Sequence, residues 1–251
     1  MTLYDDFPHV HDTTGAFSHD AAPFLPWHRY FVHLYERTLR EDCGYKGVMT
    51  YWDWTLDWEH PTAAPVWDPV HGFGGDSSPH SRPSEEVIVG QDRCVIDGPF
   101  AGLQVHWFGE HDNPHCLSRG FLDKTNFDSI GYRFSPDAVE QILGRKDYHD
   151  FQQDLEDGPH LAIPHGVGGD FFFTVAPYDP VFILHHTQLD RLWWRWQQIR
   201  PSNGMAYSGP ASHGSEDAAS LDDMLPMSNL AESIKVRELM STESDMLCYR
   251  Y

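Results

Sequence analysis

Two apolar segments with histidines inside them constrain the fold of this chain more than any other feature. The first runs from about Trp27 to Asp42, with apolar side chains at helical spacing, and Cys43-Gly44 ends it. The second runs from about Val181 to Ile199 and is closed by Pro201. Apolar residues at helical spacing indicate helices that bury one face, and glycine or proline often follows a helix end. We therefore expect two long helices in a mainly α-helical core.

Weaker signals fill in the rest of the chain. Ser135-Pro136-Asp137 combines an N-cap with a proline at the first helical position, which predicts a helix that breaks near Gly144. Another helical stretch is expected from about Tyr148 to Glu156. Residues 61–93 and 98–126 are irregular and rich in Gly, Pro, Asp and Trp, and VRELM at 236–240 is expected to be a strand. The expected architecture is a small helical core wrapped in long loops.

Length and charge limit the classes of protein that remain. A chain of 251 residues suits one large domain, and we expect residues 1–251 to form a single domain. Lys and Arg number 17 against 38 Asp and Glu, so the net charge is -21. Nucleic-acid binding and binding to an anionic membrane both need basic patches, so neither partner is expected. No apolar run approaches the roughly 18 residues that a membrane span requires.

The four cysteines leave their pairing open. They are Cys43, Cys94, Cys116 and Cys248, and none of them forms a C-x-x-C pair. A zinc ribbon or a thioredoxin-like motif is therefore not expected. Two disulfides in any of three connectivities, or free buried thiols, are both compatible with this spacing.

Histidine is the unusual residue in the composition. The chain holds 17 histidines, as many as Lys and Arg together, and imidazole is a common metal ligand. One group lies early in the chain and another late: His11, His19 and His28, then His160, His165, His185 and His186. An all-imidazole set suits copper, zinc, iron or nickel. The H-E-x-x-H motif is absent, so zinc hydrolysis lacks its general base.

Two long motifs carry a resemblance to a known family. The segment from His19 through FLPWHR to Glu36 resembles the first copper signature of tyrosinases and catechol oxidases. Asp179 to Trp193, DPVFILHHTQLDRLW, resembles the second. YDDF, YWDW, CVIDGPF, HCLSRGF and the terminal Tyr249-x-Tyr251 extend the similarity over nearly the whole chain. The chain is thus similar to the type-3 copper polyphenol oxidases, and most of all to short fungal members, whose chains usually begin earlier.

This resemblance implies a four-helix bundle that holds two copper ions, CuA and CuB, each bound by three histidines. The CuA ligands by motif position are His11, His19 and His28. His160 and His186 take the first and third positions of CuB, and His185 is expected to lie behind the ligands. Bundle cores commonly build metal sites from residues on facing helices, which agrees with this arrangement.

The second CuB ligand departs from the family pattern. It should follow His160 by four residues, but Pro164 stands there and the imidazole comes one residue later, at His165. On a regular helix a residue at i+5 is rotated by about 140° from residue i. Pro164 removes a backbone N–H and can kink the helix, so a distorted turn would return His165 to copper. We therefore predict that His165 is the second CuB ligand. The alternatives are a CuB site with only two histidines and a CuB site that holds no copper.

Several other positions have roles that the resemblance implies. Asp190 is expected to steady the ligand helix, Arg29 and Arg191 to form ion pairs, and Tyr249 with Tyr251 to anchor the end of the catalytic domain. The glycine-rich run 166–169 is interpreted as a tight turn before the phenylalanines 171–173, because it is too short for a nucleotide-binding loop.

Two positions bear on the reaction. Hydroxylases of this family tend to carry Asn directly after the first CuB histidine, where it helps an acid to orient a deprotonating water. Here Leu161 occupies that position and has no hydrogen-bonding group. Phe173 falls where catechol oxidases place a bulky gate over CuA, although the three consecutive phenylalanines are equally compatible with plain core packing. Both residues favour oxidation of o-diphenols to o-quinones, with O2 reduced to water and a small phenol as substrate.

Two other functions remain as alternatives. One is a tyrosinase that also hydroxylates monophenols. The other is a hemocyanin-like carrier that binds O2 without oxidising a phenol. A carrier domain usually has a shielding domain after it, whereas this sequence stops two residues after Tyr249, so we expect an oxidase. Phe17 stands where some relatives have a cysteine bonded to the histidine of position 19, so no such thioether is expected.

Overall fold

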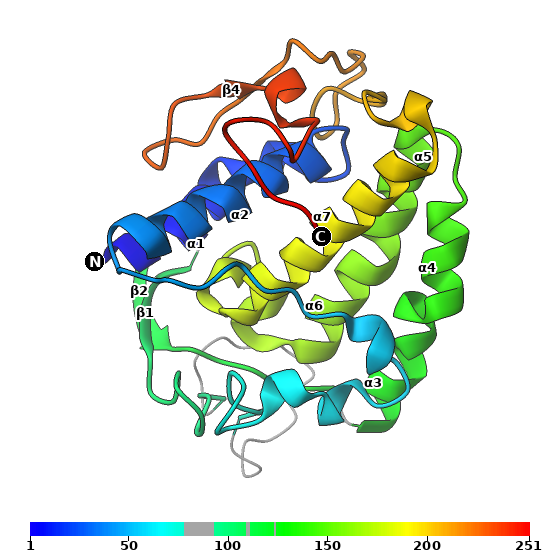
Figure 1. The fold of residues 1–251 in the computed structure, drawn as a ribbon. Coiled ribbons are helices and arrows are strands. Elements are labelled where there is room, and N and C mark those ends of the chain that lie inside the picture. Colours follow the sequence, from blue (N-terminus) through cyan, green and yellow to red (C-terminus); the bar gives the residue numbers. More distant parts are fainter. Residues whose placement is uncertain (78–92, 109–110, 123) are drawn as a thin grey trace. The chain divides into compact units, whose positions relative to one another are not determined.

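The chain forms two compact units, each built from three segments. A computed structural model describes residues 1–77, 93–108, 111–122 and 124–251, without the side chains of residues 124 and 125. Unit 1 comprises residues 1–13, 52–139 and 158–182, and unit 2 comprises residues 14–51, 140–157 and 183–251. Figure 1 gives the order of the elements along the chain. The part 78–92 of the irregular stretch expected at 61–93 lies outside the described residues.

Unit 1 combines short helices with one hairpin. Its elements are α1 (Leu3–Thr13), β1 (Gln104–Phe108), β2 (His111–Cys116), α3 (Lys124–Ile130) and α6 (Leu161–Val167). The antiparallel β1–β2 pair packs over a buried cluster of Val95, Val105, Leu117, Val175 and Tyr178. The hairpin register shifts between Val105 and Trp107. The Tyr178 hydroxyl accepts hydrogen bonds from the backbone N–H groups of His106 (3.2 Å) and Trp107 (2.8 Å), so these two donors at the bulge are satisfied.

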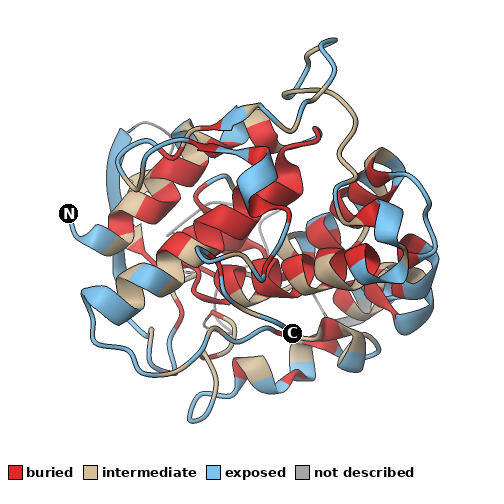
Figure 2. Cartoon of the chain, turned by 45° about the horizontal axis from the view of Figure 1, so that its top comes forward, coloured by how far each residue is buried: buried red, intermediate tan, exposed pale blue. Residues whose placement is uncertain are grey.

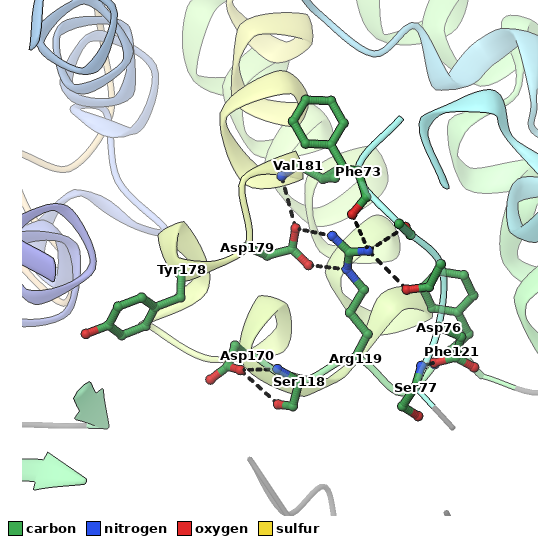
Figure 3. Close-up of polar contacts among 12 residues, drawn as sticks. Phe73, Asp76, Ser77, Ser118, Arg119, Phe121, Asp170, Tyr178, Asp179 and Val181 are labelled. Carbon is green, nitrogen blue, oxygen red and sulfur yellow. Dashed lines mark hydrogen bonds and ion pairs between the residues drawn. The ribbon is translucent and has the colours of Figure 1, made fainter. Parts of the chain in front are cut away.

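Arg119 is the centre of a buried polar network in unit 1 (Figure 3). Its guanidinium donates to both carboxylate oxygens of Asp179 at 2.6 and 2.9 Å. It also donates to the backbone carbonyls of residues 73, 74 and 75 at 2.6 to 3.2 Å. Asp179 accepts a further bond from the N–H of Val181 (3.0 Å), where α7 (Val181–Ile199) begins. A fully buried arginine needs this many partners, and the network fixes the start of α7.

Unit 2 is built on two long helices. It contains α2 (Phe24–Glu41), α5 (Tyr148–Leu155), most of α7, and a small sheet of β3 (Met224–Leu225) with β4 (Ile234–Lys235). The C-terminal tail, red in Figure 1, returns to α2 and α7, because Tyr249 and Tyr251 donate to Asp190 of α7 at 2.5 and 2.7 Å. Buried residues run along both long helices in Figure 2, as a core position requires.

Arg29 of α2 and Asp190 of α7 form the central ion pair of unit 2. The guanidinium Nε lies 2.5 Å from the carboxylate, and both side chains are buried. Arg29 also donates to the carbonyl of Leu239 (2.9 Å) and lies 3.6 Å from the centre of the Trp193 ring. The expectations for Arg29, Asp190 and the terminal tyrosines are confirmed. Arg191 instead lies over the ring of Tyr51 at 4.7 Å, so its ion pair stays a prediction.

The helices expected from the sequence are present. α7 has the predicted bounds, α2 begins three residues earlier than expected, and α5 ends one residue earlier. α4 (Pro136–Leu143) begins after Ser135, whose hydroxyl accepts the N–H of Ala138 at 3.3 Å as an N-cap. The turn interpreted at 166–169 is present only at Gly168 and Gly169, which have φ of +66° and +59° and no room for a Cβ, whereas Gly166 and Val167 belong to the helix α6 (Leu161–Val167).

Three features differ from the expectation. The strand predicted for VRELM is wrong, because Val236–Leu239 is a 3-10 turn. Val236 and Leu239 are both buried and lie three residues apart. In a strand, two residues three apart point to opposite faces, whereas a 3-10 turn places both on one side. α1, α3, α6 and the β1–β2 hairpin lie in segments that were expected to be irregular or for which no helix or strand was predicted. Cys94 and Cys116 form one disulfide, whereas Cys43 and Cys248 are free and exposed. Across the described residues, no helix is both long and apolar enough to cross a membrane.

Candidate metal centre

Unit 2 gathers four of the predicted histidines. His19 follows a short 3-10 turn, His28 lies in the second turn of α2, and His185 and His186 lie in α7. The rings of His28 and His186 stack at 4.3 Å between centroids, with 19° between their planes. His19 meets His28 edge-on at 5.0 Å. Two predicted CuA ligands and one predicted CuB ligand therefore lie together.

The predicted CuA histidines share one hydrogen-bond pattern. The Nδ1 atom of His28 lies 2.8 Å from the carbonyl oxygen of Phe24, and that of His19 lies 3.2 Å from the carbonyl of Gly15. In unit 1, Nδ1 of His11 lies 2.5 Å from the carbonyl of Thr174. A carbonyl oxygen only accepts, so each Nδ1 carries a proton, and in the neutral ring Nε2 is then the nitrogen with the lone pair. This is the tautomer that a metal bound through Nε2 requires.

Burial favours the neutral form of His19. His28 and His186 are buried, and burial lowers the pKa of His19 below its ordinary value more than its bond to Gly15 and the charge of Asp20 raise it. A neutral imidazole is the form that binds a metal ion. The residues present therefore fit a histidine-bound metal in both their protonation and their hydrogen bonding.

Unit 1 carries the other predicted ligands. His11 is buried at the end of α1, with its ring edge-on to Phe182 at 5.1 Å. His160 is also buried and is the last residue of a π-helical turn, Glu156–His160. A π-helical turn is rare and is frequently found at functional sites.

His165 differs from the other predicted ligands of unit 1, His11 and His160, which are buried. It is exposed, and its ring packs against that of Phe172 at 5.0 Å. The backbone distortion predicted near Pro164 occurs before His160, in the π-helical turn, while Leu161–Val167 is a regular helix. Regular geometry keeps a residue at i+5 rotated by about 140° from residue i, which explains the outward position.

The two residues expected to bear on the substrate are both accessible. Leu161, directly after His160, is 47% exposed. Phe173 is half-buried, and its ring meets Phe108 of β1 at 5.1 Å and Phe172 at 5.5 Å. Phe171 is buried and Phe172 is 41% exposed, so the three phenylalanines are only partly core.

Glu156 is a functional candidate that the sequence analysis missed. It is buried in unit 2, where its carboxyl accepts the N–H of Asp20 (2.9 Å) and a bond from the Gln152 amide. Burial raises the pKa of Glu156 to about 9, so the group is protonated at neutral pH. The sequence signal that could have identified Glu156 is its position four residues before His160, the predicted first CuB ligand.

The class of protein is a mainly helical one with a group of buried histidines in its core. Comparison with known proteins then gives the family. Residues 1–199 match the model of the common central domain of tyrosinase. The chain belongs to the tyrosinase family, a type-3 copper family, and is an oxidase of that family. The family resemblance and the helical fold expected from the sequence are confirmed.

Individual relatives support this assignment. A tyrosinase-like protein of Diaporthe leptostromiformis is 48% identical over 270 residues, which cover 100% of this chain and 70% of that protein. A tyrosinase of Aspergillus flavus is 43% identical over 252 residues, or 100% of this chain and 69% of the relative. The structure of a polyphenol oxidase variant from Thermothelomyces thermophila matches with a TM-score of 0.78 and 27% identity, covering 99% of this chain and 77% of the other.

The raised pKa of Glu156 predicts a pH dependence of stability. Between pH 4.5 and about 9 the unfolded state loses the Glu156 proton and the folded state keeps it, so stability falls as pH rises. The cost is at most about 1.4 kcal/mol for each pH unit in that window. Glu156→Gln removes the contribution of this carboxyl to the pH dependence of stability. The Gln152 amide can turn so that it still forms a hydrogen bond with the new side chain. We expect the apo variant to lose less stability than the parent chain between pH 5 and pH 8 in urea unfolding.

Glu216→Gln is the matched control, because Glu216 is an exposed acid of the same unit. Its pH profile should follow that of the parent chain. Parallel profiles for the parent and Glu156→Gln would show that Glu156 ionises normally in the folded state.

Proposed function

We propose that this protein oxidises o-diphenols to o-quinones and reduces O2 to water at a centre of two copper ions. The observation that carries the proposal is the stacked pair His28 and His186, at 4.3 Å between ring centroids. One belongs to the first copper motif and the other to the second. Two metals that share a substrate must lie close together, so their ligands must meet as these rings do.

The proposed ligands fall into two groups. His11, His19 and His28 would hold one copper, and each presents Nε2 because its Nδ1 is bonded to a carbonyl. His160 and His186 would hold the other. For the last ligand of the second group, the sequence predicts His165, whereas His185 is the fully buried imidazole beside His186, at 5.3 Å between ring centroids. We propose His185 for this place, because His165 is exposed in the regular helix α6.

The two bound coppers would accept electrons from the diphenol and pass them to O2. Each diphenol gives up two electrons and two protons, so two diphenols and one O2 yield two quinones and two waters. The protein supplies neutral imidazoles fixed by backbone carbonyls, and the buried Arg29–Asp190 pair holds the helices that carry His28 and His186. Leu161 and Phe173 offer apolar surface to the ring of the substrate.

Two side chains favour diphenols over monophenols. Hydroxylation of a monophenol needs a group that removes the phenolic proton before oxygen transfer. Leu161 has no polar atom to orient a water for this purpose. Glu156, with a pKa of about 9, holds its proton at neutral pH and is a poor base in this state. A diphenol is a more acidic and more easily oxidised substrate, and it needs less assistance from either group.

The substrate preference can be tested at position 161. We expect the parent chain to oxidise catechols and to show little activity on monophenols. Leu161→Asn should raise the ratio of monophenol to diphenol activity by at least about tenfold, since a positioned proton-transfer group contributes 10²–10⁴-fold. O2 consumption with 4-methylphenol and 4-methylcatechol measures the ratio.

Leu161→Ala is the control, because it opens the same space without adding a polar group. It should leave the ratio close to that of the parent chain. If the parent chain already hydroxylates monophenols as readily as it oxidises catechols, the argument from Leu161 is wrong and the protein is a hydroxylating tyrosinase.

The choice between His165 and His185 is decided by copper content. Loss of a direct ligand should weaken metal binding by at least the roughly 10–100-fold that loss of a supporting residue costs. We expect His160→Ala and His185→Ala to lose copper, and His165→Ala to keep it, under identical loading followed by metal analysis. Copper loss in His165→Ala equal to that in His160→Ala would instead make His165 a ligand that turns inward on metal binding.

A further inference from the structure

Unit 2 contains a cavity of about 920 Å³ that the proposed copper chemistry does not use. One wall is a stripe of α2 from Arg29 to Glu41, another is the segment from Val48 to Tyr51, and the third is the C-terminal tail from Met246 to Tyr251. Cavities that bind small organic molecules have about 300–1,000 Å³, so this one has room for a ligand. None of the proposed copper ligands lines it.

The cavity is rich in arginine although the protein is strongly acidic. The chain has 38 acidic against 17 basic residues, yet four arginines line this one space: Arg29, Arg37, Arg40 and Arg250. The two glutamates that line it are Glu36 and Glu41. Glu36 is already engaged, because it pairs with Arg40 at 2.8 Å and accepts the N–H of Met49 at 3.1 Å. Arg29, Arg40 and Arg250 are paired with Asp190, Glu36 and Glu243, so Arg37 is the arginine of this lining that is left to attract an anion from solution.

Arg37 is the cation best suited to bind an anion from outside. It is exposed on α2, and within the part of the chain that the structure describes it has no carboxylate partner at ion-pair distance. Arg40 is paired with Glu36, and Arg250 with Glu243. A guanidinium binds a carboxylate through two parallel N–H donors, which gives both strength and orientation.

The remaining lining is largely apolar. Val32 and Leu247 are buried, while Val48 is 68% exposed and Met246 is 37% exposed. Met49 adds a flexible side chain. Apolar surface below an exposed guanidinium fits a molecule with an apolar body and an anionic head, because each part then meets its own kind of surface.

The cavity also contacts the network that holds the two long helices together. Arg29, Tyr249 and Tyr251 line it, and all three bind Asp190 of α7. Thr187, the residue after His186, lines it as well. A ligand here would therefore touch residues adjacent in sequence to His28 and His186 without entering the metal centre.

We propose that this cavity is a binding site for a medium-chain amphipathic carboxylate, with the carboxylate on Arg37 and the alkyl chain against Val32, Val48 and Leu247. The site is independent of the proposed oxidation of diphenols. Because the ligand would bind only the folded cavity, occupancy also stabilises the fold.

The test is calorimetric titration of sodium decanoate, below its micelle concentration, into the intact 251-residue protein. We expect one saturable site. Arg37→Ala should weaken binding by about tenfold or more, as expected for the loss of a charge-assisted hydrogen bond. Decanol, which lacks the charge, should be weaker by a similar factor. Arg195→Ala is the control, because Arg195 is a half-buried arginine of α7 that does not line the cavity, and the affinity of this variant should be unchanged.

Three results would overturn the proposal. One is binding without saturation, which would indicate non-specific adsorption of the alkyl chain. Another is equal affinity for Arg37→Ala and Arg195→Ala, which would remove the anion site. The last is equal affinity for decanol and decanoate, which would leave an apolar cavity without a role for charge. Because the titration needs neither copper nor a phenol, its outcome is separate from that of the proposed oxidase function.

Discussion

The buried ion pair of Arg29 and Asp190 is the interaction on which the proposed metal-binding part of unit 2 depends. It joins α2 to α7 at 2.5 Å, and each partner lies close in sequence to a histidine of the centre, His28 or His186. Taking both charges out of water is costly unless every polar atom finds a partner. The Leu239 carbonyl, Tyr249 and Tyr251 supply those partners, so the C-terminal tail completes the pair.

Unit 1 contains a second buried ion pair, between Arg119 and Asp179. Both are fully buried, and three backbone carbonyls complete the donors of the guanidinium. Asp179 lies two residues before α7 and accepts the N–H of its first residue, Val181, and Asp190 lies in the middle of α7. Both ion pairs therefore act on the helix that carries His185 and His186. Buried arginines of this kind stabilise only with all partners present. That requirement explains why loops and a tail, rather than the helices alone, are part of the fold.

The sequence predicted the long helices because their signals are local and repeated. α7 shows apolar residues at helical spacing over five turns and a proline after its end, and its bounds were predicted correctly. The hairpin could not be predicted, because β2 holds Pro114 and polar residues, and its pairing depends on Tyr178 far along the chain. α6 was missed for a related reason, since Pro164 and Gly166 both weaken a helical pattern.

The candidate site was predictable in part. His19, His28 and His186 were expected from motif positions, and unit 2 brings them together. The position of His165 depends on where the backbone is distorted, and a π-helical turn at Glu156–His160 has no clear sequence signal. The raised pKa of Glu156 comes from burial, which only the folded structure reveals.

The central claim is that these histidines hold two copper ions, and the most direct test is metal analysis of the folded chain after saturation with copper and removal of the excess. The account predicts close to two coppers per chain, with zinc displaced by copper. A saturated value of one or fewer would contradict it, because a single metal cannot occupy both histidine groups.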